Sequence, residues 1–240
     1  MSVAGRVARI GLGAAGAWMG YAWLPHLLTA TGPWRGPASS GAVALTFDDG
    51  PDPSWTPRVL DILAARGARA TFFVIGRRAA AAPEVVRAIT DGGHEVANHT
   101  WSHRSLWFCG PHRTHEEIAR CHDTIGEQTG VAPRHFRPPW GMVNAAMWRA
   151  LRRTGERCVF WSLQPEGQRA QSAETQARYV VTRARGGAIV DLHDAEGVAG
   201  APARLAAALP AMLDGLLGAG YRLATITDVL AGAPASREAR

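Results

Sequence analysis

Residues 42–51 read Ala-Val-Ala-Leu-Thr-Phe-Asp-Asp-Gly-Pro and combine an apolar run with two adjacent carboxylates. The first six residues have the length and β-branched content of a buried strand, and Gly50-Pro51 ends that strand abruptly. Side chains alternate along a strand, so Asp48 and Asp49 point in different directions unless the backbone turns there. One carboxylate is then free to hold a cation while its neighbour accepts a proton. Alone, such a pair is more often a solvated turn, so the rest of the chain must decide.

Short apolar runs alternate with helical patterns from residue 42 onwards. We expect strands at residues 42–47, 70–75, 94–97, 135–137, 158–161, 188–192 and 221–226, and helices at residues 57–66, 83–90, 116–128, 145–153, 173–184 and 204–217. This alternation implies parallel βα units, and hence an α/β fold that is either a barrel or a doubly wound sheet. In a βα barrel, catalytic residues collect where the strands end, which is where Asp48 and Asp49 lie.

Composition narrows the classes of function. The 240 residues suit one catalytic domain with a short appendage, and 47% of them are hydrophobic. The formal charge of +6 is carried by Arg, because the chain has no Lys. No basic run is interleaved with aromatic residues, so we do not expect a nucleic-acid partner. A basic surface suits an anionic polymer of the cell envelope or anionic lipid headgroups instead.

The N-terminal residues 1–30 are predicted to be a secretory signal or a membrane anchor, with a buried helix as the alternative. Arg6 and Arg9 precede an uncharged segment, Ile10 to Leu24, which contains four Gly residues. Glycine disfavours an isolated soluble helix and is tolerated better in membranes. No small-x-small cleavage site follows, which favours a retained anchor. Because the arginines precede the segment, the positive-inside rule places the N-terminus in the cytoplasm and the domain outside.

The remaining chain divides into three parts. Residues 31–41, rich in Gly, Pro and Ser, are predicted to be a linker, residues 42–232 the catalytic domain, and residues 233–240 a flexible tail. The three Cys residues form no CxxC pair, so at most one disulfide is expected, between Cys109 and Cys121.

Three further segments carry groups suited to chemistry. His99-Thr100-Trp101-Ser102-His103 sets two imidazoles four residues apart, which one helical turn would place on the same face. Two imidazoles and a carboxylate such as Asp49 are a common catalytic zinc site.

Arg137 begins the stiff segment Arg-Pro-Pro-Trp-Gly and would keep Asp48 ionised if buried beside it. His193 ends an apolar strand and suits a general acid. By contrast, His112 and His115 are interpreted as part of a solvated loop.

Together these segments resemble the polysaccharide deacetylases of carbohydrate esterase family 4. The first motif of that family is similar to residues 46–50 (TFDDG), the second to residues 99–103 (HTWSH), the third to residues 137–141 (RPPWG) and the fifth to residues 192–194 (LHD). The resemblance covers about residues 42 to 230. It implies a distorted (β/α) barrel with fewer than eight complete units. It also implies a divalent metal, with Zn²⁺ first and Co²⁺, Ni²⁺ or Mn²⁺ as alternatives.

The resemblance assigns a role to each matching residue. Asp48 would be the general base, Asp49, His99 and His103 the metal ligands, Arg137 the residue that orients Asp48, His193 the general acid, and the backbone N–H of Trp140 an oxyanion donor. The implied activity is metal-dependent removal of N-acetyl groups from an aminoglycan such as peptidoglycan or a chitin-like polymer. The alternatives are hydrolysis of an N-formyl or non-sugar amide, and a glycan-binding domain that has lost turnover.

The chain departs from the family pattern in one region. Gln164, Gly167 and Gln168 stand where the fourth motif usually has acidic residues and a Trp, and Asp191 stands where the fifth motif has a Leu. Residues i and i+2 of a strand share a face, so Asp191 would face the same way as His193 and replace its missing acidic partner. Otherwise Asp191 makes the acyl pocket more polar. Glu166 is a second candidate partner for His193.

Overall fold

The computed structural model describes residues 13, 15–25, 32–166, 171–197 and 200–232. Part of the predicted signal or anchor segment and the whole predicted tail, residues 233–240, lie outside these residues. Among the described residues, no helix is both long enough and apolar enough to cross a membrane.

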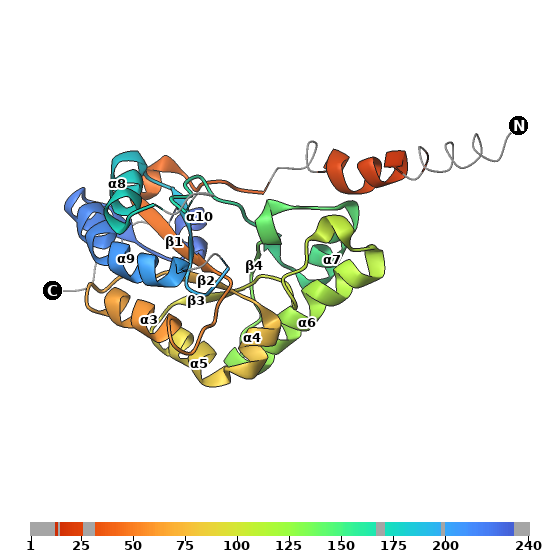
Figure 1. The fold of residues 1–240 in the computed structure, drawn as a ribbon, viewed down its shortest axis with the longest axis horizontal. Coiled ribbons are helices and arrows are strands. Elements are labelled where there is room, and N and C mark those ends of the chain that lie inside the picture. Colours follow the sequence, from red (N-terminus) through yellow and green to blue (C-terminus); the bar gives the residue numbers. More distant parts are fainter. Residues whose placement is uncertain (1–12, 14, 26–31, 167–170, 198–199, 233–240) are drawn as a thin grey trace, which may run out of the picture.

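A curled, all-parallel sheet forms the centre of the molecule (Figure 1). Its strands within the described residues are β1 (Ala42–Asp48), β2 (Thr71–Val74), β3 (Glu95–Asn98), β4 (His135–Phe136), β5 (Arg157–Cys158), β6 (Ile189–His193) and β7 (Arg222–Leu223). They are ordered β5-β4-β3-β2-β1-β6, and β7 pairs with the start of β1. The segment after β5 reaches β6 through a parallel bridge between Leu163 and Val190. This bridge joins the two ends of the sheet, which gives a distorted barrel rather than an open doubly wound sheet.

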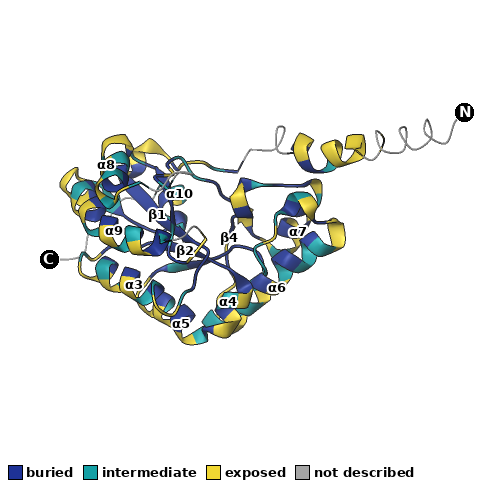
Figure 2. Ribbon diagram, in the orientation of Figure 1, coloured by how far each residue is buried: buried dark blue, intermediate teal, exposed yellow. Residues whose placement is uncertain are grey.

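Helices cover the outside of the sheet, with their exposed faces turned to solvent (Figure 2). They are α3 (Thr56–Ala64), α4 (Gly76–Ala81), α5 (Pro83–Asp91), α6 (Pro111–Thr129), α7 (Ala145–Thr154), α8 (Ala173–Arg183), α9 (Ala201–Gly218) and α10 (Ile226–Ala231). Shorter helical turns are η1 (Met19–Trp23), η2 (Ala38–Ser40), η3 (Leu106–Phe108) and η4 (Pro139–Gly141). Each strand of the barrel leads into a loop that ends at a helix, as the alternating pattern predicts.

The central strand β1 shows how the sequence positions the site. All seven of its residues are buried. Val43, Leu45 and Phe47 belong to the main apolar core beneath the helices. Thr46 and Asp48 alternate with them and point to the interior of the barrel, where both contact the same arginine. The apolar face therefore anchors the strand while the other face carries the polar groups.

Three details differ from the sequence prediction. The helix predicted at residues 116–128 begins at Pro111, so His112 and His115 lie on α6 and not in a loop. The predicted last strand is only Arg222–Leu223, because Thr225 caps α10 by accepting a hydrogen bond from the Asp228 N–H (3.2 Å). Cys109, Cys121 and Cys158 are buried free thiols, so the disulfide prediction is wrong.

The segment that we predicted to be a linker lies against the domain. Gly36 N–H donates to the Gly187 carbonyl (2.7 Å), Arg35 bridges to Ala188, and Trp34 stacks on Phe160 with ring centroids 5.0 Å apart. Residues 33–40 therefore form part of the packing around β6 rather than a free spacer.

Candidate active site

The two adjacent carboxylates diverge because the backbone turns at the end of β1. Asp48 is the last strand residue and faces the barrel interior, whereas Asp49 has a φ of 70° and turns towards the loop after β3. The next residue must be Gly, because a Cβ on Gly50 would lie 2.6 Å from the carboxylate of Asp194. The two aspartates therefore diverge through this turn rather than through simple strand alternation, and Asp48 binds Arg137 while Asp49 faces His103.

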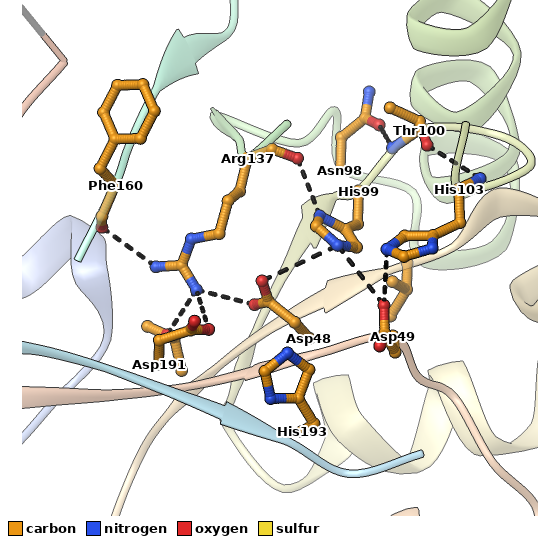
Figure 3. Close-up of polar contacts among 12 residues, drawn as sticks. Asp48, Asp49, Asn98, His99, Thr100, His103, Arg137, Phe160, Asp191 and His193 are labelled. Carbon is orange, nitrogen blue, oxygen red and sulfur yellow. Dashed lines mark hydrogen bonds and ion pairs between the residues drawn. The ribbon is translucent and has the colours of Figure 1, made fainter. Parts of the chain in front are cut away.

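Asp49 meets two imidazoles from the loop after β3 (Figure 3). Its Oδ1 lies 2.9 Å from His103 Nε2 and 3.6 Å from His99 Nε2. The ligand atoms of Asp49, His99 and His103 all lie within 4.8 Å of one another. Burial would raise the pKa of Asp49, but the two imidazoles outweigh burial and hold it well below its usual range. The carboxylate is therefore ionised, as a metal ligand must be.

The donor set fits a divalent metal ion. His99 Nδ1 lies 2.8 Å from the Arg137 carbonyl oxygen, to which it donates, so His99 Nε2 carries the lone pair towards Asp49. Asp49 Oδ1 is a buried oxygen without a hydrogen-bond partner among the described residues. A buried carboxylate oxygen facing two imidazole nitrogens is the arrangement of a two-His, one-carboxylate site.

The loop that carries the two histidines is not a helical turn, so that part of the sequence prediction is wrong. Thr100 and His103 have positive φ angles of 68° and 59°, which few residues with a Cβ adopt. Asn98 Oδ1 accepts from the Thr100 N–H (2.9 Å), and Thr100 Oγ1 accepts from the His103 N–H (3.0 Å). These side chains fold residues 99–103 tightly enough to bring both rings to Asp49, with centroids 5.1 Å apart.

Arg78 and Glu117, which were not predicted from the sequence, hold the loops of the site in place through hydrogen bonds. Arg78, on α4, donates to the Asp49 carbonyl (2.7 Å) and to the Glu196 carbonyl (3.3 Å). Glu117, buried on α6, accepts from both the N–H and the hydroxyl of Ser102 at 2.7 Å. Neither stands near a motif in the sequence, so only the folded path of the chain reveals them.

Arg137 is fully buried and binds Asp48. Its Nη1 donates to Asp48 Oδ1 (2.7 Å), to Thr46 Oγ1 (2.7 Å) and to Asp191 Oδ1 (3.3 Å), and Nη2 donates to the Phe160 carbonyl (3.2 Å). The predicted contact between Arg137 and Asp48 is present. The guanidinium also meets a second carboxylate, which the family pattern does not include.

His193 lies beside Asp48 in the register of the paired strands β1 and β6. Its Nδ1 lies 2.6 Å from Glu166 Oε2, so Glu166 is the hydrogen-bonded acidic partner. Burial would lower the pKa of His193, but the carboxylates of Asp191, Glu166 and Asp48 outweigh burial and raise it to about 10.

Asp191 takes other partners. It contacts Arg137 and accepts from Gln164 Nε2 (3.1 Å). Burial and the nearby Asp48 raise the pKa of Asp191 well above its usual range, against the opposing effects of His193 and Arg137. Of the two partners proposed for His193, the structure thus brings Glu166 and not Asp191 into hydrogen-bonding distance.

Trp140 lies at the mouth of the site. Its residue surface is 60% exposed, its φ is 55°, and its ring centroid is 4.5 Å from that of His103. Its N–H is not used in any backbone hydrogen bond among the described residues, which suits the predicted oxyanion donor.

A model of the polysaccharide deacetylase family matches residues 35–159, which is more than half of the chain. The chain belongs to the polysaccharide deacetylase family. Peptidoglycan-N-acetylglucosamine deacetylase of Bacillus cereus is 35% identical over 82% of this chain and 92% of its own length. Chitooligosaccharide deacetylase of a Bradyrhizobium species is 40% identical over 64% of this chain and 70% of its own length.

A solved structure supports the same family and fold. A family 4 carbohydrate esterase from Streptomyces lividans, in complex with acetate, matches with a TM-score of 0.68 and 34% identity, over 75% of this chain and 90% of that structure. The predicted family, the distorted barrel and the polysaccharide N-deacetylase class are therefore confirmed. The roles of single residues in this polysaccharide deacetylase stay predictions.

Proposed function

We propose that the protein hydrolyses the N-acetyl amide of amino sugars in an envelope aminoglycan, using a divalent metal ion held by Asp49, His99 and His103. The observation that supports this most is the convergence of three metal-ligating atoms, a buried carboxylate and a carboxylate-paired histidine at the ends of β1, β3 and β6. The two relatives named above act, by their names, on peptidoglycan N-acetylglucosamine and on chitooligosaccharides. An N-acetylated amino-sugar polymer is therefore the substrate class that we propose.

The metal supplies one part of the chemistry. When bound, a divalent ion supplies a Lewis acid for the amide carbonyl and for the attacking water. Zn²⁺ suits two imidazoles and one carboxylate best, and Co²⁺, Ni²⁺ and Mn²⁺ are the alternatives.

Side chains of the protein carry out the proton transfers. Asp48, which Arg137 orients through a 2.7 Å hydrogen bond, takes a proton from the attacking water. A C–O bond to the acyl carbon forms, and the N–H of Trp140 donates to the oxygen on which negative charge develops. His193, whose proton is stabilised by Glu166, then protonates the leaving nitrogen as the C–N bond breaks. The products are acetate and a free amino sugar.

A second acyl group is a candidate for removal by this site. Asp191 places a carboxylate on the face of β6 that also carries His193, where the family pattern has a Leu. A polar wall suits a small polar acyl group, such as N-formyl, better than it suits a methyl group. Hydrolysis of an N-formyl amide is therefore the second activity to test.

We also propose that the catalytic domain works outside the cytoplasm, tethered by the N-terminal segment. Two observations support this proposal. Arg6 and Arg9 precede the uncharged segment, and the Bacillus cereus relative is named for a cell-wall polymer.

Release of acetate and of formate tests the reaction. Purified protein is treated with a chelator, dialysed, reloaded with each of the four metals, and assayed on N-acetylated and N-formylated glucosamine oligomers and on isolated peptidoglycan. We expect acetate release that the chelator abolishes and Zn²⁺ restores. Formate release in excess of acetate supports the second candidate. No release of either acid from any substrate with any of the metals contradicts both.

A further inference from the structure

One end of the molecule exposes a group of large apolar side chains, which we call the aromatic ridge: Trp18, Met19, Trp23, Leu24 and Phe108. Their exposed fractions run from 37% for Trp18 to 81% for Phe108. Exposed apolar side chains are ordinary when scattered, but four within residues 18–24 and a fifth, Phe108, in contact with Trp18 indicate an interaction surface.

Specific contacts hold the ridge against the domain. Trp18 Nε1 donates to the Trp107 carbonyl (3.1 Å), and the Trp18 ring stacks on Phe108 with centroids 6.4 Å apart. Tyr21 donates its hydroxyl proton to the Cys109 carbonyl (2.9 Å), while Ala22 is fully buried. The residues around η1 therefore use one face to contact η3 and present Trp23 and Leu24 on another.

A cationic groove lies between α6 and α7. It encloses about 220 Å³ and is lined by Pro111, His112, His115, Ala146, Arg149, Ala150 and Arg153. We call its four basic side chains, His112, His115, Arg149 and Arg153, the basic groove. Glu116 pairs with His112 (3.6 Å) and with Arg113 (3.4 Å). Among the described residues, Arg149 and Arg153 form no ion pair with a carboxylate, so both guanidinium groups are available to a ligand.

The ridge and the groove lie at the same end of the molecule. Asn144, which caps α7, donates through Nδ2 to the Leu106 carbonyl (2.6 Å) and to Thr114 Oγ1 (2.9 Å). These contacts bind the start of α7 to both η3 and α6, and Phe108 is only three residues from Pro111. Figure 1 shows the N-terminal helix at the end of the molecule that α6 and α7 also occupy.

We propose that this end is a membrane-interface surface, in which the ridge enters the headgroup region of a bilayer and the basic groove binds the phosphate of an anionic lipid. Tryptophan is enriched at the interface between lipid and water, and arginine matches phosphate oxygens in charge and shape. A sugar polymer would explain exposed rings, but not Met19 and Leu24 beside them. Four of the five ridge residues belong to the N-terminal segment that we propose as the tether, so this surface describes how that segment contacts the bilayer, and it does not rest on the proposed reaction.

Binding of the full chain to lipid vesicles tests the proposal. The dissociation constant is measured for phosphatidylcholine vesicles with and without phosphatidylglycerol, so that the ratio isolates the anionic contribution from any tether. We expect the double variant R149Q/R153Q to weaken binding to the anionic vesicles by about 30-fold, with little change for the neutral ones. The matched control R87Q/R178Q removes two exposed arginines on α5 and α8 and should stay within about 3-fold of the wild type.

A second variant tests the ridge alone. Phe108→Ser should weaken binding to both kinds of vesicle by about 10-fold, because an apolar ring no longer enters the interface. Val131→Ser, which changes a 64% exposed residue just after the other end of α6, should have no such effect. Wild-type affinity of R149Q/R153Q for anionic vesicles overturns the proposal. Loss of binding to isolated peptidoglycan with vesicle binding intact also overturns it and assigns the groove to the polymer.

Discussion

Arg137 connects the two halves of the candidate site. Its carbonyl oxygen fixes the His99 ring, and its guanidinium lies between Asp48 and Asp191. Removing a fully buried charge with two carboxylate partners leaves uncompensated anions and costs about 3–5 kcal/mol of stability. A variant at Arg137 would therefore damage folding and catalysis together, so the peripheral members of the site are better tests.

His103 is such a member, because its side chain remains 21% exposed. We expect His103→Ala to abolish turnover and to lower bound metal to well under one ion per chain, while the circular dichroism spectrum stays unchanged. Metal content after dialysis is measured by atomic spectrometry. His112→Ala is the control, because His112 is 88% exposed on α6 and lies outside the metal site. Full metal content in His103→Ala would remove His103 from the ligand set.

A change at Glu166 tests the role of His193 as the general acid. With its carboxylate 2.6 Å from His193 Nδ1, the pKa of the imidazole is raised, and the proton that the leaving nitrogen needs is retained to high pH. Glu166→Gln keeps the shape and removes the charge, so the pKa of His193 falls and the basic limb of the kcat profile moves to lower pH. Glu174→Gln, an exposed change on α8, is the control. An unmoved basic limb in Glu166→Gln contradicts the pairing.

Elements with strong periodicity are those that the sequence predicts well. The strand from Ala42 to Asp48 and the helix from Ala145 to Thr154 differ from their predicted ranges by one residue at one end. Helix α4 (Gly76–Ala81) was missed because six residues of Gly, Arg and Ala show no apolar period. Helix α10 was missed because Ile226 reads as a continuation of the preceding apolar run.

In the candidate site, too, some residues can be predicted from the sequence and others cannot. The sequence predicts six site residues because each stands in a motif at a strand end: Asp48, Asp49, His99, His103, Arg137 and His193. The left-handed turn at Thr100 was not found, because it depends on a hydrogen bond from its own N–H to the Asn98 side chain. Arg78 reaches the Asp49 carbonyl from the helix after β2, and Glu117 reaches Ser102 from the helix that follows the histidine loop, and no local pattern encodes either contact.

Burial of the Asp191 carboxylate on β6 should lower the stability of the fold by an amount that depends on pH. Burial and Asp48 raise its pKa in the folded protein above the value in the unfolded chain, so the folded state binds more protons in the range between them. Stability attributable to Asp191 is thus fully present at low pH and is lost as pH rises through its folded pKa. We expect Asp191→Asn to raise the melting temperature at pH 8 and to change it little near pH 4. Melting curves across this range provide the test, and an equal shift at every pH would contradict the argument.

At the scale of the whole molecule, the barrel brings together groups that are far apart in the chain. Asp49 follows β1, the two histidines follow β3, Arg137 follows β4, and His193 ends β6. The parallel bridge between Leu163 and Val190 brings the segment after β5, with Gln164 and Glu166, beside β6. The site is therefore a property of the closed sheet, and the acidic partner of His193 reaches it only because the sheet closes.

This arrangement predicts that metal binding and global stability are linked. The ligands come from the ends of two strands, so an ion that binds only the folded chain should stabilise the whole domain by about 2.7 kcal/mol at 100 times its dissociation constant. For a domain of this size, that corresponds to a rise in melting temperature of about 5–10 °C. Thermal melts of chelator-treated protein with and without Zn²⁺ measure the rise, and His103→Ala should lose most of it. A rise of equal size in His103→Ala would mean that the stabilising ion binds elsewhere.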